Sequence, residues 1–129
     1  MVNLSSGNAA ASVPATVTIP ATLSAAQFVI STNPVSANTG IVISASKNSV
    51  TRTAFMAVNA PALSTFTLGS SSVVGGQNGS LTVTLNALAP TGGYSISLIS
   101  GAPSLVVLPS STAVPAATNT RNLAFTTAD

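Results

Sequence analysis

The sequence predicts an all-β protein of antiparallel strands, arranged as a β-sandwich. Apolar and polar residues alternate with a period of two over short stretches, most regularly over residues 81–85 and 94–98, as expected for strands with one face on a core. Segments rich in Gly, Asn and Pro follow about every 8–12 residues, which is typical of sandwiches and barrels. No stretch longer than about one turn has the spacing of an amphipathic helix.

Ten strands are predicted, and residues that favour turns separate them. In the first half of the chain they cover residues 2–4, 17–19, 28–30, 41–43 and 53–58. In the second half they cover residues 65–68, 81–85, 94–98, 106–108 and 123–125. The turns between them contain Gly7-Asn8, Asn33-Pro34, Asn48 and the Gly-rich segments 75–79 and 90–93, residue types that interrupt regular structure.

Charged side chains are almost absent. Lys47, Arg52, Arg121 and Asp129 make up 3% of the 129 residues, against about 25% in an ordinary soluble domain. The sequence has no Cys, no His and no Trp. It therefore lacks nearly all the side chains that perform acid–base catalysis, hold zinc or bind hard cations. We expect no enzymatic activity, no catalytic residue, no cofactor and no bound metal.

Other classes of low-charge protein fit the sequence less well. With 46% apolar residues it is too hydrophobic for a disordered chain. Polar residues or prolines interrupt every apolar run, so no membrane-spanning helix is expected. The three scattered cations are too few to neutralise a phosphate backbone, so no nucleic-acid partner is expected. The first residues lack the pattern of a signal sequence.

Three local features could suggest a catalytic, phosphate-binding or calcium-binding site, but the sequence supports none of the three. A serine nucleophile beside Lys47, such as Ser46, is disfavoured because neighbouring positions on a strand point to opposite faces. The segment 75–79 resembles a phosphate-binding loop, but neither a Lys-Ser/Thr pair nor a helix follows it. Asp129 is the single acidic residue, which is too few for a calcium site.

Part of the sequence recurs after about 95 residues. Residues 2–7, Val-Asn-Leu-Ser-Ser-Gly, resemble residues 96–101, Ile-Ser-Leu-Ile-Ser-Gly, at a spacing of 94 residues. Residues 28–32 recur as 123–127 at a spacing of 95 residues, so one residue is inserted between the two blocks. This period is too long for a solenoid repeat and is close to the length of a sandwich domain.

Several segments carry a family resemblance. They include residues 2–6, 13–21 and 28–32, residues 63–68 with 72–76, and Val58-Asn59-Ala60-Pro61, which is similar to a short linker between repeats. Together they resemble the Ig-like tandem repeats of large bacterial surface and secreted proteins. The resemblance covers nearly the whole chain. It implies an immunoglobulin-like antiparallel β-sandwich and an extracellular location at a bacterial surface.

On this pattern the chain is out of phase with the repeat. Residues 1–58 are similar to the C-terminal part of one repeat without its first strands, and residues 62–129 to the N-terminal part of a second repeat without its last strands; residues 59–61 form the linker. Two interpretations stay open. The chain is a segment of a longer array, or strands from a neighbouring copy complete its sandwiches, because open sheet edges pair with other strands.

An apolar outer surface is expected on the first repeat. Alternation directs Ile41 inward, whereas Val29, Val42, Phe55 and Ala57 take outward positions. With so few charges to keep copies apart, we expect these four residues to form an assembly face that packs against another subunit or domain.

Two functional hypotheses follow. The first is a structural module, an Ig-like building block of an extracellular filament, surface layer or adhesin stalk, whose partners are copies of itself or neighbouring repeats. The second is a domain that binds glycan or ice. The Thr pairs at 16/18, 51/53 and 82/84 suggest the ice form, while a single Tyr, Tyr94, and no Trp leave a glycan ligand little support.

Overall fold

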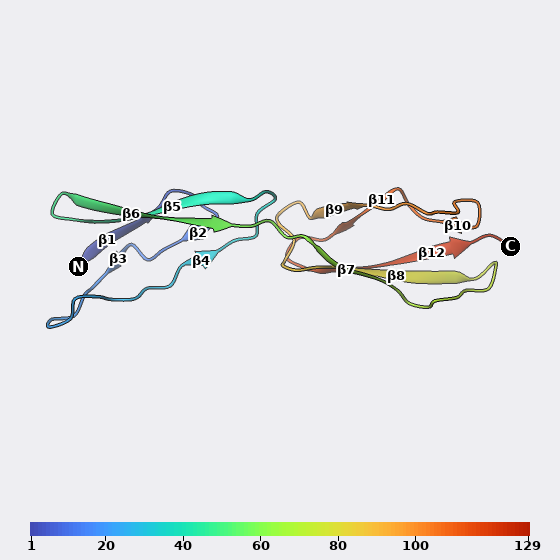
Figure 1. The fold of residues 1–129 in the computed structure, drawn as a ribbon, viewed down its shortest axis with the longest axis horizontal. Coiled ribbons are helices and arrows are strands. Elements are labelled where there is room, and N and C mark those ends of the chain that lie inside the picture. Colours follow the sequence, from blue (N-terminus) through green and yellow to red (C-terminus); the bar gives the residue numbers. More distant parts are fainter. The chain divides into compact units, whose positions relative to one another are not determined.

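The structure is a computed structural model that describes residues 1–129, and every regular element in it is a β-strand (Figure 1). The strands pair antiparallel throughout, so the predicted antiparallel all-β class is confirmed. The chain divides into two compact units, Met1–Ala60 and Pro61–Asp129. The boundary lies within the segment 59–61 that the sequence marks as a linker.

The first unit contains a four-stranded sheet and a two-stranded sheet. The large sheet has the order β3-β1-β5-β6, and the small sheet pairs β2 with β4. The strands are β1 (Val2–Ser6), β2 (Ala11–Ser12), β3 (Thr16–Val17), β4 (Ser31–Thr32), β5 (Thr39–Lys47) and β6 (Val50–Val58). β5 and β6 form a hairpin in which Lys47 pairs with Val50. Asn48 and Ser49 close it with φ angles of 50° and 62°, as in a two-residue primed turn.

Alternation along β5 builds the core of the first unit. Ile41 and Ile43 are 1% and 7% exposed, and they pack with Ala10 and Ala11. Val42, between the two isoleucines, is 45% exposed on the opposite face. The inward and outward positions expected for this strand are therefore confirmed.

The second unit also contains a four-stranded sheet and a two-stranded sheet. The large sheet has the order β10-β12-β8-β7, and the small sheet pairs β11 with β9. The strands are β7 (Leu63–Leu68), β8 (Asn78–Leu85), β9 (Tyr94–Ser97), β10 (Val106–Val107), β11 (Ser111–Val114) and β12 (Thr120–Thr127).

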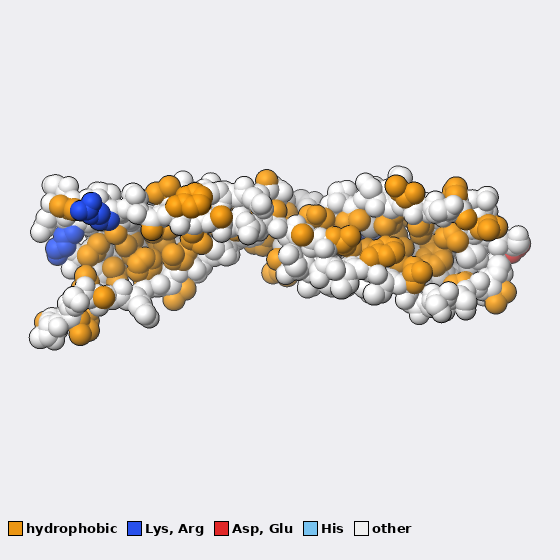
Figure 2. All heavy atoms as spheres, in the orientation of Figure 1, with side chains coloured by type: hydrophobic (Ala, Val, Ile, Leu, Met, Phe, Trp, Pro, Cys, Tyr) orange, Lys and Arg blue, Asp and Glu red, His pale blue; other side chains and the backbone are white.

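The core of the second unit lies on the inner face of β8. Leu81, Val83 and Leu85 are at most 2% exposed. Leu81 and Val83 pack with Phe125 of β12, and Leu85 packs with Val114 of β11. In Figure 2, apolar side chains remain visible along the middle of each unit, between its two groups of strands.

The predicted strand over residues 28–30 is wrong, although its apolar pattern is strand-like. β4 begins only at Ser31 and pairs over two residues with β2. Residues 28–30 have no neighbouring strand to pair with, and a strand exists only where a second strand satisfies its backbone. Two short strands, β2 (Ala-Ser) and β11 (Ser-Thr-Ala-Val), were not predicted, because neither carries a run of alternating apolar and polar residues.

Candidate functional site

The two units contain the same pair of antiparallel strands. Val2 of β1 pairs with Val17 of β3 in the first unit, and Ile96 of β9 pairs with Thr112 of β11 in the second. Ile96 lies 94 residues after Val2, and Thr112 lies 95 residues after Val17. The β9–β11 ladder thus has the register of the β1–β3 ladder.

The hydrogen bond that extends each of these ladders is also repeated. The backbone N–H of Leu4 donates to the carbonyl of Ala15 over 2.8 Å, and that of Leu98 donates to the carbonyl of Ser110 over 3.0 Å. The same spacings of 94 and 95 residues relate the two donors and the two acceptors. In both units the N–H of this buried leucine therefore points toward β3 or its equivalent, β11.

A second ladder recurs at a spacing of 95 residues. Ala11 pairs with Thr32 between β2 and β4, and Val106 pairs with Thr127 between β10 and β12. Each ladder continues with a backbone hydrogen bond of 2.9 Å at the same relative place, from Asn33 to Ala10 and from Ala128 to Leu105.

The turn between the two ladders has the same conformation in both units. In turns 20–23 and 115–118 the N–H of the last residue donates to the carbonyl of the first, over 3.1 and 3.2 Å. Thr22 and Ala117, the third residues of these turns, have positive φ angles of 72° and 59°. Two non-glycine residues 95 positions apart thus share an uncommon backbone conformation.

The two ladders and the turn between them form a segment that both units share, residues 2–33 in the first unit and 96–128 in the second. The units differ in the strand that pairs with this shared segment. In the first unit β1 has β5 on its second side, whereas β9 has only β11. In the second unit β12 has β8 on its second side, whereas residues 23–30 belong to no strand. Each unit therefore has an open position where the other unit has a strand.

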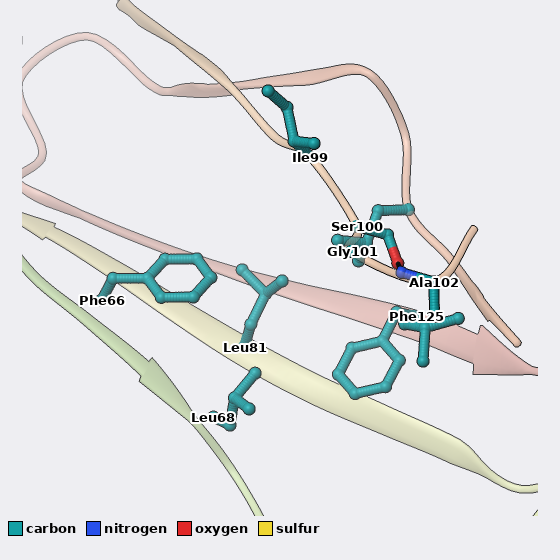
Figure 3. Close-up of a pocket in the computed structure, with 10 residues that line it drawn as sticks. Phe66, Leu68, Leu81, Ile99, Ser100, Gly101, Ala102 and Phe125 are labelled. Carbon is teal, nitrogen blue, oxygen red and sulfur yellow. Dashed lines mark hydrogen bonds between the residues drawn. The ribbon is translucent and has the colours of Figure 1, made fainter.

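An apolar groove lies beside the open position of the second unit (Figure 3). It has a volume of about 310 Å³ and is lined by Phe66, Leu68, Leu81, Ile99, Ser100, Gly101, Ala102, Val106, Leu108 and Phe125. In Figure 3, Phe66 and Phe125 lie on either side of Leu81, and segment 99–102 passes across from them. We take this groove as the candidate binding site.

The exposure of two β7 side chains shows that no further strand or loop lies over this groove. Phe66 pairs with Val83 and Leu68 with Leu81, so both side chains point to the face of the sheet that carries the core. They are nevertheless 50% and 53% exposed. The sequence analysis missed this site. The alternation in residues 65–68 already directs the side chains of Phe66 and Leu68 inward, but only the order of the strands shows that no further strand covers them.

The four residues of the expected assembly face lie on two different segments. Val42 and Phe55 pair directly across β5 and β6, and Ala57 pairs with Gly40 on the same two strands. Phe55 is 73% exposed, and its ring lies over Gly40, which has no side chain to displace it. Val29 is 77% exposed but lies in the segment before β4, outside the four-stranded sheet. Three of the four residues therefore share one surface.

The basic groups of the first unit gather at one end of its sheet (Figure 2). Lys47 ends β5, and Arg52 pairs with Ala45 on the same hairpin. The pKa of the Met1 amino group lies below its ordinary value, first because of its hydrogen bond with the Lys47 side chain and then because of charge repulsion from it. No three side chains of the His, Cys, Asp or Glu type come together. No helix long and apolar enough to cross a membrane is present.

The sequence matches no protein-family model, no curated protein and no solved structure in the comparisons made with it.

Proposed function

We propose that this chain is a non-enzymatic structural module, built from Ig-like repeats of about 95 residues, in an extracellular filament, surface layer or adhesin stalk of a bacterium. The recurrence of two strand ladders and one unusual turn at spacings of 94 and 95 residues carries the proposal. Two unrelated folds have no physical reason to repeat both a register and a left-handed residue.

The sheet orders support the Ig-like form. An Ig sandwich of the constant type has strands ABED in one sheet and CFG in the other. The order β7-β8-β12-β10 corresponds to A-B-E-D. In the order β3-β1-β5-β6, the strands β1-β5-β6 correspond to C-F-G, and β3 is an additional strand beside C. The shared segment then represents strands C to E, which both units contain.

The surface of the first unit supports a role in assembly. Phe55 and Val42 form an exposed apolar pair, and the 129 residues carry four charges. Charge is the main means by which soluble proteins prevent association of like surfaces. A surface with an apolar centre and few charges favours packing against a similar surface.

The experiment is self-association of the purified chain, measured by size-exclusion chromatography and negative-stain imaging. We expect concentration-dependent assemblies, and we expect Phe55→Asp to shift them toward monomer because the substitution buries a charge in the contact. Thr126→Asp adds the same charge to an exposed position of the second unit and serves as the control. A chain that stays monomeric at high concentration, unchanged by Phe55→Asp, contradicts the filament and surface-layer forms and leaves the stalk.

One observation favours a second function, the binding of ice or glycan. On β7, β8 and β12 of the second unit, Thr84 pairs with Thr65 and with Thr120, and Thr82 pairs with Thr67 and with Asn122. These side chains form two rows on one face, with spacings of about 4.8 Å between strands and about 6.8 Å along them. Of the other Thr pairs, Thr16 lies on β3 and Thr18 follows that strand, whereas Thr51 and Thr53 lie on β6. β3 and β6 do not adjoin. An ice-affinity assay and a glycan array test this function, and no retention in either removes it.

A further inference from the structure

The open edge of β9 leads to an inference that rests on the proposed repeat. In the first unit, β1 pairs along the equivalent edge with β5, from Asn3 opposite Ser46 to Ser6 opposite Ile43. In the second unit β9 has no strand on this side. We propose that the second unit binds, at this edge and over the adjoining groove, an antiparallel β-hairpin of the β5–β6 type that belongs to a further repeat of the same kind.

The repeat spacing fixes the register of this hairpin. A shift of 94 residues carries Asn3 onto Ser97 and Ser5 onto Ile99. Ser5 pairs with Ser44 in the first unit, so Ile99 pairs with the counterpart of Ser44 in the incoming strand. The N–H of Leu98 is bonded toward β11, and N–H groups alternate in direction along a strand. β9 ends at Ser97, but the Leu98 bond shows that the ladder extends one residue further. In this extension of the strand, the N–H of Ile99 points to the open edge and is a donor for the hairpin.

The edge continues past β9 in the same way. In the first unit the N–H of Gly7 donates to the carbonyl of Val42 over 2.9 Å. The equivalent of Gly7 is Gly101, at the rim of the groove. The counterpart of Val42 then accepts a hydrogen bond from Gly101, which extends the new ladder over the groove.

The groove accepts the inward side chains of the same strand. Ile41 and Ile43 fill the core of the first unit, and their counterparts enter the groove between Leu81 and Phe66. Its volume of about 310 Å³ is roughly twice the ~150 Å³ of a cavity that accommodates one benzene molecule, so it has space for two branched side chains. The hairpin also covers Phe66 and Leu68, which explains why inward-facing residues are half exposed in the unit as it stands.

A further repeat is a better source of the hairpin than a second copy of this chain. The hairpin of a second copy is already paired with its own β1 in the register that β9 offers. Transfer of that hairpin to β9 exchanges one ladder for an identical one and leaves the donor β1 paired only with β3. A hairpin from a repeat that has no other partner for it gains the full ladder and the burial of the groove.

The test is a chain extended after Asp129 by a second copy of residues 35–58. Asp129 is equivalent to Pro34 at the spacing of 95 residues, so the added segment follows in phase. The chain has no cysteine, and a disulfide therefore reports the register directly. One variant combines Ile99→Cys with Ser44→Cys in the added copy, and the matched control combines Ile99→Cys with Ala45→Cys in the added copy.

We expect a disulfide within the chain for the Ser44 variant and its loss in the Ala45 control. Directly paired residues have Cα atoms about 5.5 Å apart, within the range a disulfide needs, whereas the next residue points to the opposite face. Mass spectrometry of the digested protein at low concentration identifies the bond. No disulfide in either variant, or equal amounts in both, overturns the proposal.

Two further measurements keep the result decisive. If the extended chain does not fold, free peptides of residues 35–58 replace the extension. A peptide with Ser44→Cys should form a disulfide with the unextended Ile99→Cys chain, and a control peptide with Ala45→Cys should not. In the unextended chain with Ile99→Cys and Ser44→Cys, disulfide-linked dimers would show that a second copy is the donor and would contradict a further repeat. The disulfide forms within one chain, so its failure is distinct from the absence of the assemblies measured above.

Discussion

Gly93 combines a positive φ angle with a close approach to the backbone of another strand. Its φ angle is 81°, and a Cβ atom at this position would lie 2.8 Å from the carbonyl oxygen of Val114. Val114 is fully buried and packs with Leu85, so the carbonyl has little freedom to move. The Gly92-Gly93 pair therefore gives the chain the bend with which it enters β9.

Gly93→Ala should destabilise the second unit by about 1–3 kcal/mol, the usual cost of a strained backbone position. Tyr94 is the single tyrosine of the chain and the sequence has no Trp, so its fluorescence during urea unfolding follows this unit. Gly101→Ala is the control, because a Cβ atom at Gly101 meets nothing within 4 Å and its φ angle is not positive. Equal midpoints for the two variants would contradict this account of Gly93.

At the scale of elements, the turns 20–23 and 115–118 limit the stability of the segment that both units share. Their third residues, Thr22 and Ala117, have positive φ angles, in a position where turns of this kind favour glycine. A left-handed conformation costs a residue with a side chain about 1–2 kcal/mol. Part of this cost can be removed by substitution.

Ala117→Gly should stabilise the second unit by about 0.5–1 kcal/mol, the relief of strain minus the added entropy of the unfolded chain. Ala116→Gly, at the preceding residue, should destabilise the same unit by about 0.4–1 kcal/mol, since it adds only the entropy. Urea unfolding monitored at Tyr94 compares the two variants. A loss of stability in Ala117→Gly would show that the turn does not have this conformation.

The elements also show how far the sequence predicts the structure. Alternation is a property of single strands, and it located β8 and β5 because each has one face on a core. It failed at residues 28–30, where the apolar pattern is present but the partner strand is not, because pairing depends on residues far along the chain. The proposed repeat stays a prediction from the sequence, whereas the open edge of β9 and the groove follow only from the strand order.

At the scale of the whole molecule, the proposed function gives the small number of charges and the open strand positions a common explanation. A module that packs laterally and completes its sheets with strands of the same kind has no use for charges that repel its neighbours. Exposed apolar residues such as Phe55, Phe66 and Leu68 are then contact residues rather than defects.

Residue-resolved hydrogen exchange of the native chain tests most directly the equivalence of the two units and their difference at the edge of β9. The amides of Leu4 and Leu98 both donate within their ladders and should exchange slowly. The amide of Ser5 faces β5 and should also exchange slowly, whereas that of Ile99, 91% exposed and directed at the open edge, should exchange at nearly the rate of an unfolded chain. Slow exchange at Ile99, or fast exchange at Leu98 beside a slow Leu4, would contradict the account.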